Sequence, residues 1–302
     1  MWNRIVRSLS FALILSSSTV TLAEDPAAAA KADIQKTLGF TPKFFTQFPA
    51  SALPGAWEEM KGLQLSPNTA LSGEVKELIG LAVAAQVPCD YCIYAHTEFA
   101  ALNGADAEER AEAIAVGAQE RHASAYFYGL QQSPETLRAE VAKIIAYVKQ
   151  KKAPGAPTVV TDAASARADI TQTLGFVPEF LRRVPDGALP GVWREMKELK
   201  LSSSTRLSAK TKALVSLAVA SQVPSQACVI AETEFAKLAG ATDREIAEAV
   251  GMAAITRNMS TLLNGLRVDM RAFAADIDKL VAGAKKAAAA NAAKPAAAVA
   301  KR

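Results

Sequence analysis

The sequence predicts an all-α protein in which two helical-bundle domains follow one another as a tandem repeat. The stretch that begins at Ala32 recurs at Ala168, and 16 of the 28 positions from Asp33 to Met60 are identical at a shift of 136 residues. Apolar residues in each copy follow the spacing of helices, and no run alternates as a half-buried strand does. A chain of 302 residues, half of them hydrophobic, is also long enough to bury two cores.

Residues 1–23 are predicted to form a secretory signal peptide. Arg4 and Arg7 precede a short apolar run, and small residues end the segment before Glu24. The apolar run is too short to span a bilayer as a helix, so no membrane span is expected in the mature protein. We expect that protein to begin at Glu24 and to be periplasmic or secreted. The alternative is an N-terminal helix that is disordered or buried.

The predicted organisation after the signal peptide has four parts. A first helical domain with a cysteine pair covers residues 24–150, and a second helical domain covers residues 167–282. The Pro, Gly and Ser content of residues 151–166 is typical of a linker. Residues 283–302 form a low-complexity tail rich in Ala and Lys, a composition that cannot bury enough apolar surface to fold alone.

The basic character of the chain is concentrated outside the two domains. The whole sequence has a formal charge of +4. Without the two arginines of the signal peptide the charge is +2, and without the five basic residues of the tail as well it is −3. A body with this charge gives no indication of a nucleic-acid groove, so no nucleic-acid partner is expected.

The helices are expected in the same order in both domains. Ser72 is a candidate N-cap for a helix that runs to about Gln86, and Pro88 precedes the next helix. A capping box then opens a helix in each copy, and Ser133 precedes the last helix of the first copy. The two capping boxes pair Asp106 with Glu109 and Thr242 with Glu245.

The segment PCDYCIYAH holds the only two cysteines that lie close together in the sequence, Cys89 and Cys92. On a helix that starts after Pro88, these residues lie on one face and are close enough for a disulfide, and His96 lies one turn further on. The free N–H groups at the helix start favour a thiolate near Cys89. His96 is able to accept a thiol proton or, when charged, to stabilise a thiolate.

Several chemistries compete for this cluster. Attachment of a c-type haem needs a histidine directly after the second cysteine, where this chain has Ile93. Zinc lacks an obvious fourth ligand, so no metal site is expected. A structural disulfide is common in exported proteins, but a bridge across two residues closes a small loop and removes little chain entropy. The cluster therefore favours redox chemistry, with zinc and a structural disulfide as alternatives.

Together with Glu77, the spacing of Cys89, Cys92 and His96 resembles the active-site signature of the alkylhydroperoxidase D-like branch of the carboxymuconolactone decarboxylase family. The segments LGFTPKFF and LPGAWEEM also resemble the N-terminal region of that family. The resemblance implies an all-α fold, homo-oligomers such as trimers or hexamers, and reduction of a hydroperoxide substrate by the cysteine pair. It implies no metal and no organic cofactor.

The resemblance also implies roles for the four residues. Cys92 would attack the peroxide, Cys89 would resolve the product, and Glu77 with His96 would relay protons. An external thiol or dithiol would then reduce the disulfide. The helix dipole instead favours Cys89 as the thiolate, and Glu77 beside other charged residues is also typical of a solvated face. The chain departs from the pattern at Tyr91, where some of these enzymes have a second histidine.

The second copy has lost this signature, so the sequence predicts one active centre per chain. Ser225 replaces the first cysteine, Cys228 remains, and Glu232 and Ala213 replace the histidine and the glutamate. The predicted function is an exported thiol-dependent peroxidase or thiol–disulfide oxidoreductase. The alternatives are a carboxymuconolactone decarboxylase-type enzyme and a non-catalytic scaffold with a structural disulfide.

Overall fold

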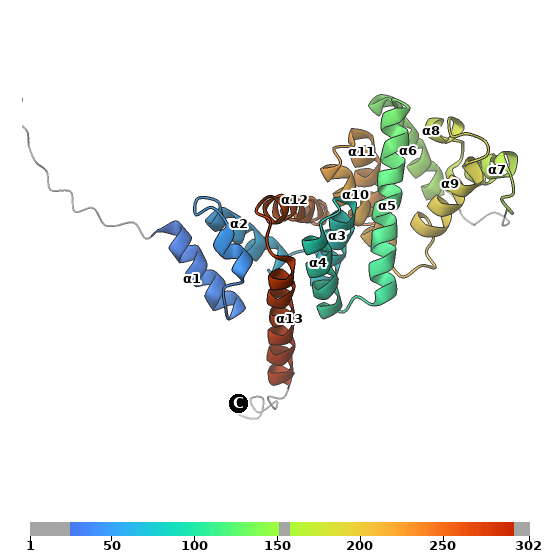
Figure 1. Ribbon diagram of the computed structural model, residues 1–302. Coiled ribbons are helices and arrows are strands. Elements are labelled where there is room, and N and C mark those ends of the chain that lie inside the picture. Colours follow the sequence, from blue (N-terminus) through green and yellow to red (C-terminus); the bar gives the residue numbers. More distant parts are fainter. Residues whose placement is uncertain (1–24, 151–157, 293–302) are drawn as a thin grey trace, which may run out of the picture.

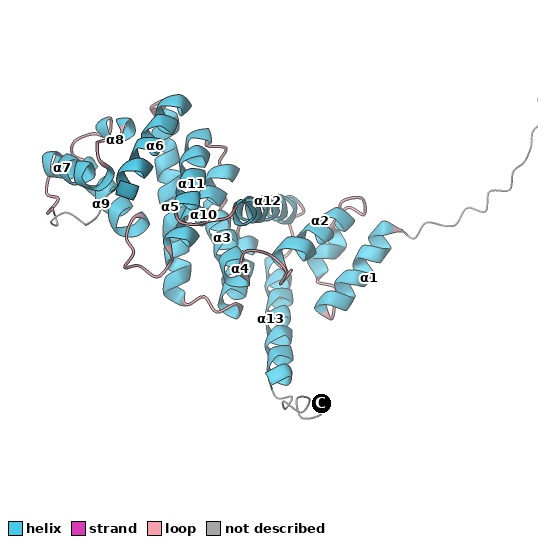
Figure 2. Cartoon of the chain, turned by 180° about the vertical axis from the view of Figure 1, so that it is seen from behind, coloured by secondary structure: helices cyan, strands magenta, loops and turns pink. Residues whose placement is uncertain are grey.

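A computed structural model describes residues 25–150 and 158–292 of the chain (Figure 1). Outside these residues lie the predicted signal peptide, residues 151–157 of the predicted linker and residues 293–302 of the predicted tail. The described residues form helices joined by loops and contain no strand, which confirms the all-α prediction (Figure 2). No helix in this part of the chain is both long and apolar enough to cross a membrane.

The two repeats contain equivalent helices, and four of the α-helices and the π-helical turn have the same bounds after the shift of 136 residues. The first repeat consists of α1 (Pro26–Leu38), a 3-10 turn η1 (Lys43–Gln47), α2 (Leu53–Glu59), a π-helical turn η2 (Met60–Gln64), α3 (Gly73–Gln86), α4 (Asp90–Leu102), α5 (Ala107–Gly129) and α6 (Pro134–Gln150). The second consists of α7 (Ala163–Leu174), α8 (Glu179–Arg182), α9 (Leu189–Glu195), a π-helical turn η3 (Met196–Lys200), α10 (Ala209–Gln222), α11 (Gln226–Leu238), α12 (Asp243–Gly265) and α13 (Met270–Ala292).

Local sequence signals explain where these helices begin. Ser72 accepts a hydrogen bond from Val75 N and caps α3, as predicted. Capping boxes open α5 and α12 at the predicted residues. The predicted start of α4 after Pro88 is also confirmed, with Cys89 itself in the N-cap position. Each of these caps satisfies a backbone N–H that has no partner within its own helix.

Two helices extend past the predicted domain boundaries. The helix α7 begins inside the stretch assigned to the linker, because Asp162 and Ser165 form a capping box there. The helix α13 continues to Ala292, well into the stretch assigned to the low-complexity tail. Alanine and lysine favour the helix even where no core is available, and the side chains from 282 to 290 are exposed.

The last helix of each repeat packs on the other repeat. The helix α13 contacts α4 and η1 of the first repeat, and α6 contacts α11 and α7 of the second. The helices α1 and α2 lie at the opposite end of the molecule from α7 to α9 (Figure 1). Polar contacts repeat this exchange: Lys43 N donates to Asp276 Oδ2 at 2.6 Å, and Glu179 N donates to Glu140 Oε1 at 2.8 Å. The tandem repeat is confirmed, while the exchange is a feature that the sequence does not predict.

The centre of the molecule is a shared core. The helices α3 and α10 pack against each other, with α12 on α3 and α5 on α10. Gly117 of α5 lies so close to Ala82 and Val219 that an added Cβ would be 3.2 Å and 3.4 Å from their side chains. The largest apolar cluster contains buried residues of both repeats, such as Trp57 and Met252. Each repeat therefore buries part of its apolar surface against the other.

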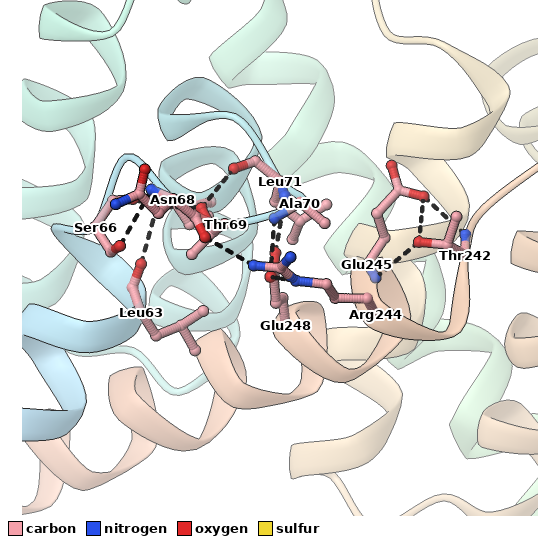
Figure 3. A network of polar contacts seen from close by, with 11 residues as sticks. Leu63, Ser66, Asn68, Thr69, Ala70, Leu71, Thr242, Arg244, Glu245 and Glu248 are labelled. Atoms are coloured by element: carbon pink, nitrogen blue, oxygen red, sulfur yellow. Dashed lines mark hydrogen bonds and ion pairs between the residues drawn. The ribbon is translucent and has the colours of Figure 1, made fainter.

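A polar network fixes the loop that leads into α3 (Figure 3). The Glu248 carboxylate of α12 accepts from Ala70 N at 2.9 Å and from Leu71 N at 2.8 Å. Arg244 bonds to Glu248 and donates to Asn68 O at 2.7 Å. The second repeat has the equivalent contacts, because its loop residues Arg206 and Leu207 donate to Glu112 of α5. The site described below is thus anchored to the partner repeat.

We predict that Glu248→Ala destabilises the protein. The substitution leaves two backbone N–H groups without their charged acceptor, and the free energy of unfolding should fall by about 2 kcal/mol or more. Urea unfolding measures the effect, with the exposed Glu58→Ala on α2 as a control that should change it by less than about 0.5 kcal/mol. Equal losses for both variants would contradict an anchoring role for Glu248.

Candidate active site

The two cysteines of the pair meet at the N-terminus of α4. Cys89 caps the helix, and its Sγ accepts a hydrogen bond from Cys92 N at 3.3 Å. A hydrogen bond also joins the two sulfurs, which are 2.7 Å apart, and both thiols are free and buried. Ser225 keeps the capping role in the second repeat, where its Oγ accepts from Cys228 N at 3.4 Å. Cysteine and serine therefore fill the same capping position in the two repeats, and only the first repeat has a thiol there.

Residues of α12 complete the surroundings of Cys89. Asn264 Nδ2 donates to Cys89 Sγ at 3.5 Å. The hydrogen bond from Cys92 lowers the pKa of Cys89 to about 6, although burial opposes this, and hydrogen bonds from Ser260, Cys92 N and Asn264 lower it further. The second repeat thus helps to stabilise a thiolate on the first repeat.

Cys92 differs from Cys89 in acidity and in access. Its hydrogen bond to Cys89, together with burial, raises the pKa of the Cys92 thiol. Cys92 and His96 line a pocket of about 70 Å³ between α4, α12 and α13, and Cys89 does not line it. The first proton of the dithiol therefore leaves from Cys89, while a small molecule in the pocket would meet Cys92.

A chain of polar side chains holds His96. Its Nδ1 is 2.6 Å from Glu77 Oε2, and its Nε2 is 3.3 Å from Thr256 Oγ1. Gln64 Nε2 in turn donates to Glu77 Oε1 at 3.1 Å. Glu77 is only 3% exposed, so the reading of this residue as part of a solvated face is wrong. The carboxylate orients the imidazole and leaves Nε2 as the atom that faces the remaining site.

Gly80 provides the space for the imidazole. A Cβ added to this residue of α3 would lie 2.3 Å from His96 Cε1 and 2.4 Å from His96 Nδ1. The second repeat has Ser216 at the equivalent position, where Glu232 replaces the histidine. Only glycine allows α3 to approach His96 this closely while Nδ1 keeps its contact with Glu77.

Tyr91 lies beside the site but is engaged elsewhere. Its hydroxyl donates to Val268 O at 2.6 Å, and its ring packs edge-on against Phe273 with centroids 5.4 Å apart. The phenol therefore joins α4 to the segment between α12 and α13.

The structure brings all four predicted residues together, and it adds others that the sequence reasoning missed. Glu77, Cys89, Cys92 and His96 form one buried cluster. The missed residues that contact the cluster are Gln64, Gly80, Thr256, Ser260 and Asn264. Thr256, Ser260 and Asn264 are spaced four residues apart on α12, so they form a polar stripe along one face of the helix. This stripe is visible in the sequence.

The equivalent place in the second repeat holds a buried charge cluster in place of a dithiol. Lys200 Nζ is 2.7 Å from Glu120 Oε2 and 2.5 Å from Glu232 Oε1. Burial raises the pKa of the Cys228 thiol, which has no second cysteine beside it. Within residues 25–150 and 158–292, no three His, Cys, Asp or Glu side chains are grouped so that they could hold a metal ion.

Known proteins provide two matches to the chain. The profile of the carboxymuconolactone decarboxylase family matches residues 52–127 and 188–269, and the two segments begin 136 residues apart. A solved structure from Burkholderia xenovorans, described as a candidate gamma-carboxymuconolactone decarboxylase subunit, is similar with a TM-score of 0.48 and 17% identity over 88% of this chain and 97% of that chain. No curated protein matches. The spacing of the two family segments supports the repeat.

We predict that the reduced protein forms a thiolate with a midpoint near pH 6, because the pKa of Cys89 is lowered to about 6 from 9.0. The ultraviolet absorbance of the thiolate, followed against pH, measures this midpoint. Since the pKa is lower in the folded than in the unfolded chain, the ionised thiol stabilises the fold fully above pH 9.0, and this stabilisation is lost as the pH falls through about 6.

Two variants control this titration. Cys89→Ser should remove the midpoint, and Cys228→Ser should leave it in place. A midpoint near pH 9.0 in the unmodified protein would contradict the assignment.

Proposed function

Because the chain belongs to the carboxymuconolactone decarboxylase family, we propose that it acts as an exported, thiol-dependent peroxidase that reduces hydroperoxides through Cys89 and Cys92. One arrangement carries the proposal: a buried dithiol in which one thiol is acidic and the other lies on a pocket beside His96. Export rests on the sequence pattern of residues 1–23, which lie outside the described residues.

Cys92 is the residue that attacks the peroxide in this mechanism. Its sulfur is the one on the pocket, and the Cys89 thiolate at 2.7 Å is placed to accept its proton. The Cys92 sulfur then forms a bond to one peroxide oxygen as the O–O bond breaks. The products are a sulfenic acid on Cys92 and an alkoxide, which needs a proton.

His96 supplies that proton. It lines the same pocket as Cys92, and its Nδ1 is held by Glu77, so Nε2 is the atom that donates to the alkoxide oxygen. The alcohol that results leaves the pocket, and His96 takes up a proton again before the next turnover. Glu77 is a positioning residue in this step, since it contacts the imidazole.

Cys89 completes the reaction. Its sulfur bonds to the Cys92 sulfur, and the sulfenic oxygen leaves as water with the remaining thiol proton, which gives a disulfide. The cysteines are already adjacent, so little movement is needed. An external thiol or dithiol then reduces the disulfide by exchange and is itself oxidised.

The pocket favours a hydroperoxide with an apolar substituent. Apart from Gln64, Cys92 and His96, the lining side chains are all hydrophobic, and Phe44 and Phe99 are among them. An apolar substituent would remove this hydrophobic lining from contact with water, which favours binding. A small polar peroxide lacks such a substituent and would not gain this contribution.

The alternatives explain fewer of these features. A decarboxylase acting on a lactone acid has no need of a thiol pair. A structural disulfide has no need of an acidic thiol, a pocket on Cys92 or a buried contact between His96 and Glu77. Thiols with shifted pKa values beside a pocket are more typical of a catalytic site than of a structural one.

We predict that Cys92→Ser abolishes peroxide consumption, whereas Cys89→Ser reduces at most one equivalent. That variant lacks the thiolate that accepts the Cys92 proton, so its first turnover should be slower. No thiol is then present to resolve the sulfenic acid on Cys92, so a sulfenic-acid reagent should label it. Mass spectrometry after one equivalent of peroxide measures both outcomes. Cys228→Ser is the matched control and should keep full activity.

The assignment of roles is wrong if Cys92→Ser retains the first turnover, since Cys89 would then be the nucleophile. Loss of activity in Cys228→Ser alone would contradict a single active centre per chain.

We also predict that Gly80→Ala lowers kcat/KM by up to about a hundredfold, the lower range of what general acid–base catalysis contributes. The new methyl group must displace the His96 ring from Glu77. The thiolate midpoint near pH 6 should not change, because its causes do not include His96. Gly55→Ala on α2, where no atom lies within 4 Å of an added Cβ, is the control with unchanged kcat/KM. An unaffected rate in Gly80→Ala would exclude His96 from the proton transfer.

A further inference from the structure

The second repeat has a larger pocket at the place that is equivalent to the catalytic pocket. Its volume is about 370 Å³, against about 70 Å³ in the first repeat. The equivalent lining positions explain the difference in part, because Ala123 replaces Met259 and Leu137 replaces Phe273. The shift of 136 residues relates most of the lining, so the two pockets occupy equivalent places, and the second has no cysteine pair.

The polar groups of this pocket are unusual for a cavity with a mostly hydrophobic lining. Lys200 and Glu232 lie on it, and Glu120 of α5 pairs with Lys200 behind it. Glu140 of α6 also lines it. Glu232 and Glu140 are 4% and 6% exposed, and one oxygen of each, Oε2, has no hydrogen-bond partner.

These oxygens need donors that the protein does not provide. Lys200 already pairs with two carboxylates. Lys212, the other cation of the lining, donates to Leu199 O at 2.8 Å, to Ser202 O at 2.7 Å and to a threonine hydroxyl. A buried carboxylate oxygen without a partner is costly, so a ligand that brings donors would stabilise the site.

The charge of the lining selects among such ligands. When ionised, the lining carboxylates of Glu140 and Glu232, with Glu120 behind them, outnumber the cations beside them, which are Lys200 and an arginine at 4.0 Å from Glu140 Oε1. Lys212 is engaged with its loop and lies 3.5 Å from a further glutamate. An anion would be repelled, and a neutral alcohol would bring one donor and no charge. A protonated amine brings both the charge and several donors.

We propose that this pocket binds an amphiphilic amine, a molecule with an apolar body and a protonated amino group that contacts Glu232. The apolar body fills the space between α6, α11 and the turn η3, against side chains such as Phe127, Ile144 and Phe235. The site is a binding site separate from the catalytic dithiol, because the second repeat has Ser225 at the cap position and no cysteine pair.

Binding should be linked to protons. Burial raises the pKa of Glu232 to about 8, with Lys200 opposing and Glu120 adding to the rise. Glu140 and Lys212 are the other charged groups on the lining. A cation stabilises the ionised form of Glu232, so binding at neutral pH releases a proton, and affinity should increase as the pH rises toward 8.

Calorimetric titration of the full chain with n-octylamine, below the concentration at which it self-associates, tests the proposal. Octanoate and octanol are the comparison ligands, and both should bind more weakly by roughly tenfold or more, because they lack the charge-assisted hydrogen bond. Glu232→Gln should weaken octylamine binding by a similar factor. Repeating the titration in buffers of different protonation enthalpy measures the released proton.

A matched pair of variants locates the ligand. Val148 lies at an exposed position on the pocket lining, and Val148→Trp should abolish binding by filling the opening. Val250 is similarly exposed on α12 and does not line the pocket, so Val250→Trp should bind as the unmodified chain does. Cys92→Ser should also bind normally, which separates this result from that of the peroxidase assay. Preference for octanoate, equal binding by octanol, or binding that survives Val148→Trp would overturn the proposal.

Discussion

The candidate active site depends on the packing of α12 against α3 and α4. This helix places the side chains of Thr256, Ser260 and Asn264 along one face, where they meet the N-terminus of α4. Burying a single ionised group costs several kcal/mol, while one hydrogen bond to a charged group contributes about 1.5–3 kcal/mol. One donor is therefore insufficient for the Cys89 thiolate, and donors from two repeats are needed to offset its burial. The bond network around Glu248 holds the same helix against the loop before α3.

Local chemistry determined most of what the sequence could predict. Helix starts at Ser72, Asp106 and Thr242 depend on a side chain and a backbone N–H three residues apart, so they are visible in the sequence. The spacing of Cys89, Cys92 and His96 likewise follows from one helix and its cap. The extension of α13 was missed because an exposed helix of good helix formers lacks the apolar pattern on which the prediction relied.

Contacts between distant segments account for the rest. Nothing in a repeated pattern distinguishes a last helix that packs on its own repeat from one that packs on the other, because the apolar face is the same in both cases. The exchange of α6 and α13 is therefore set by the way the whole core closes. Thr256 and Asn264 could not be assigned to the site either, because the repeated sequence pattern does not tell which helix packs beside α4. Four equivalent positions at which the repeats differ in polarity do mark the two sites, and all of these residues except Lys200 are buried: Gln64 and Lys200, Gly80 and Ser216, His96 and Glu232, Thr256 and Glu120.

The covalent joining of the repeats has a consequence for how the molecule can evolve. In an assembly of identical chains, every substitution appears at all equivalent positions, so a residue that improves one site alters each of its copies. Here Asn264 contacts Cys89 in the first site, whereas its counterpart Tyr128 is 87% exposed. The helices α5 and α12 are thus free to diverge, each under selection from the site that it completes. Two copies joined in one chain can therefore hold two pockets of different lining and volume between helices that pack on each other.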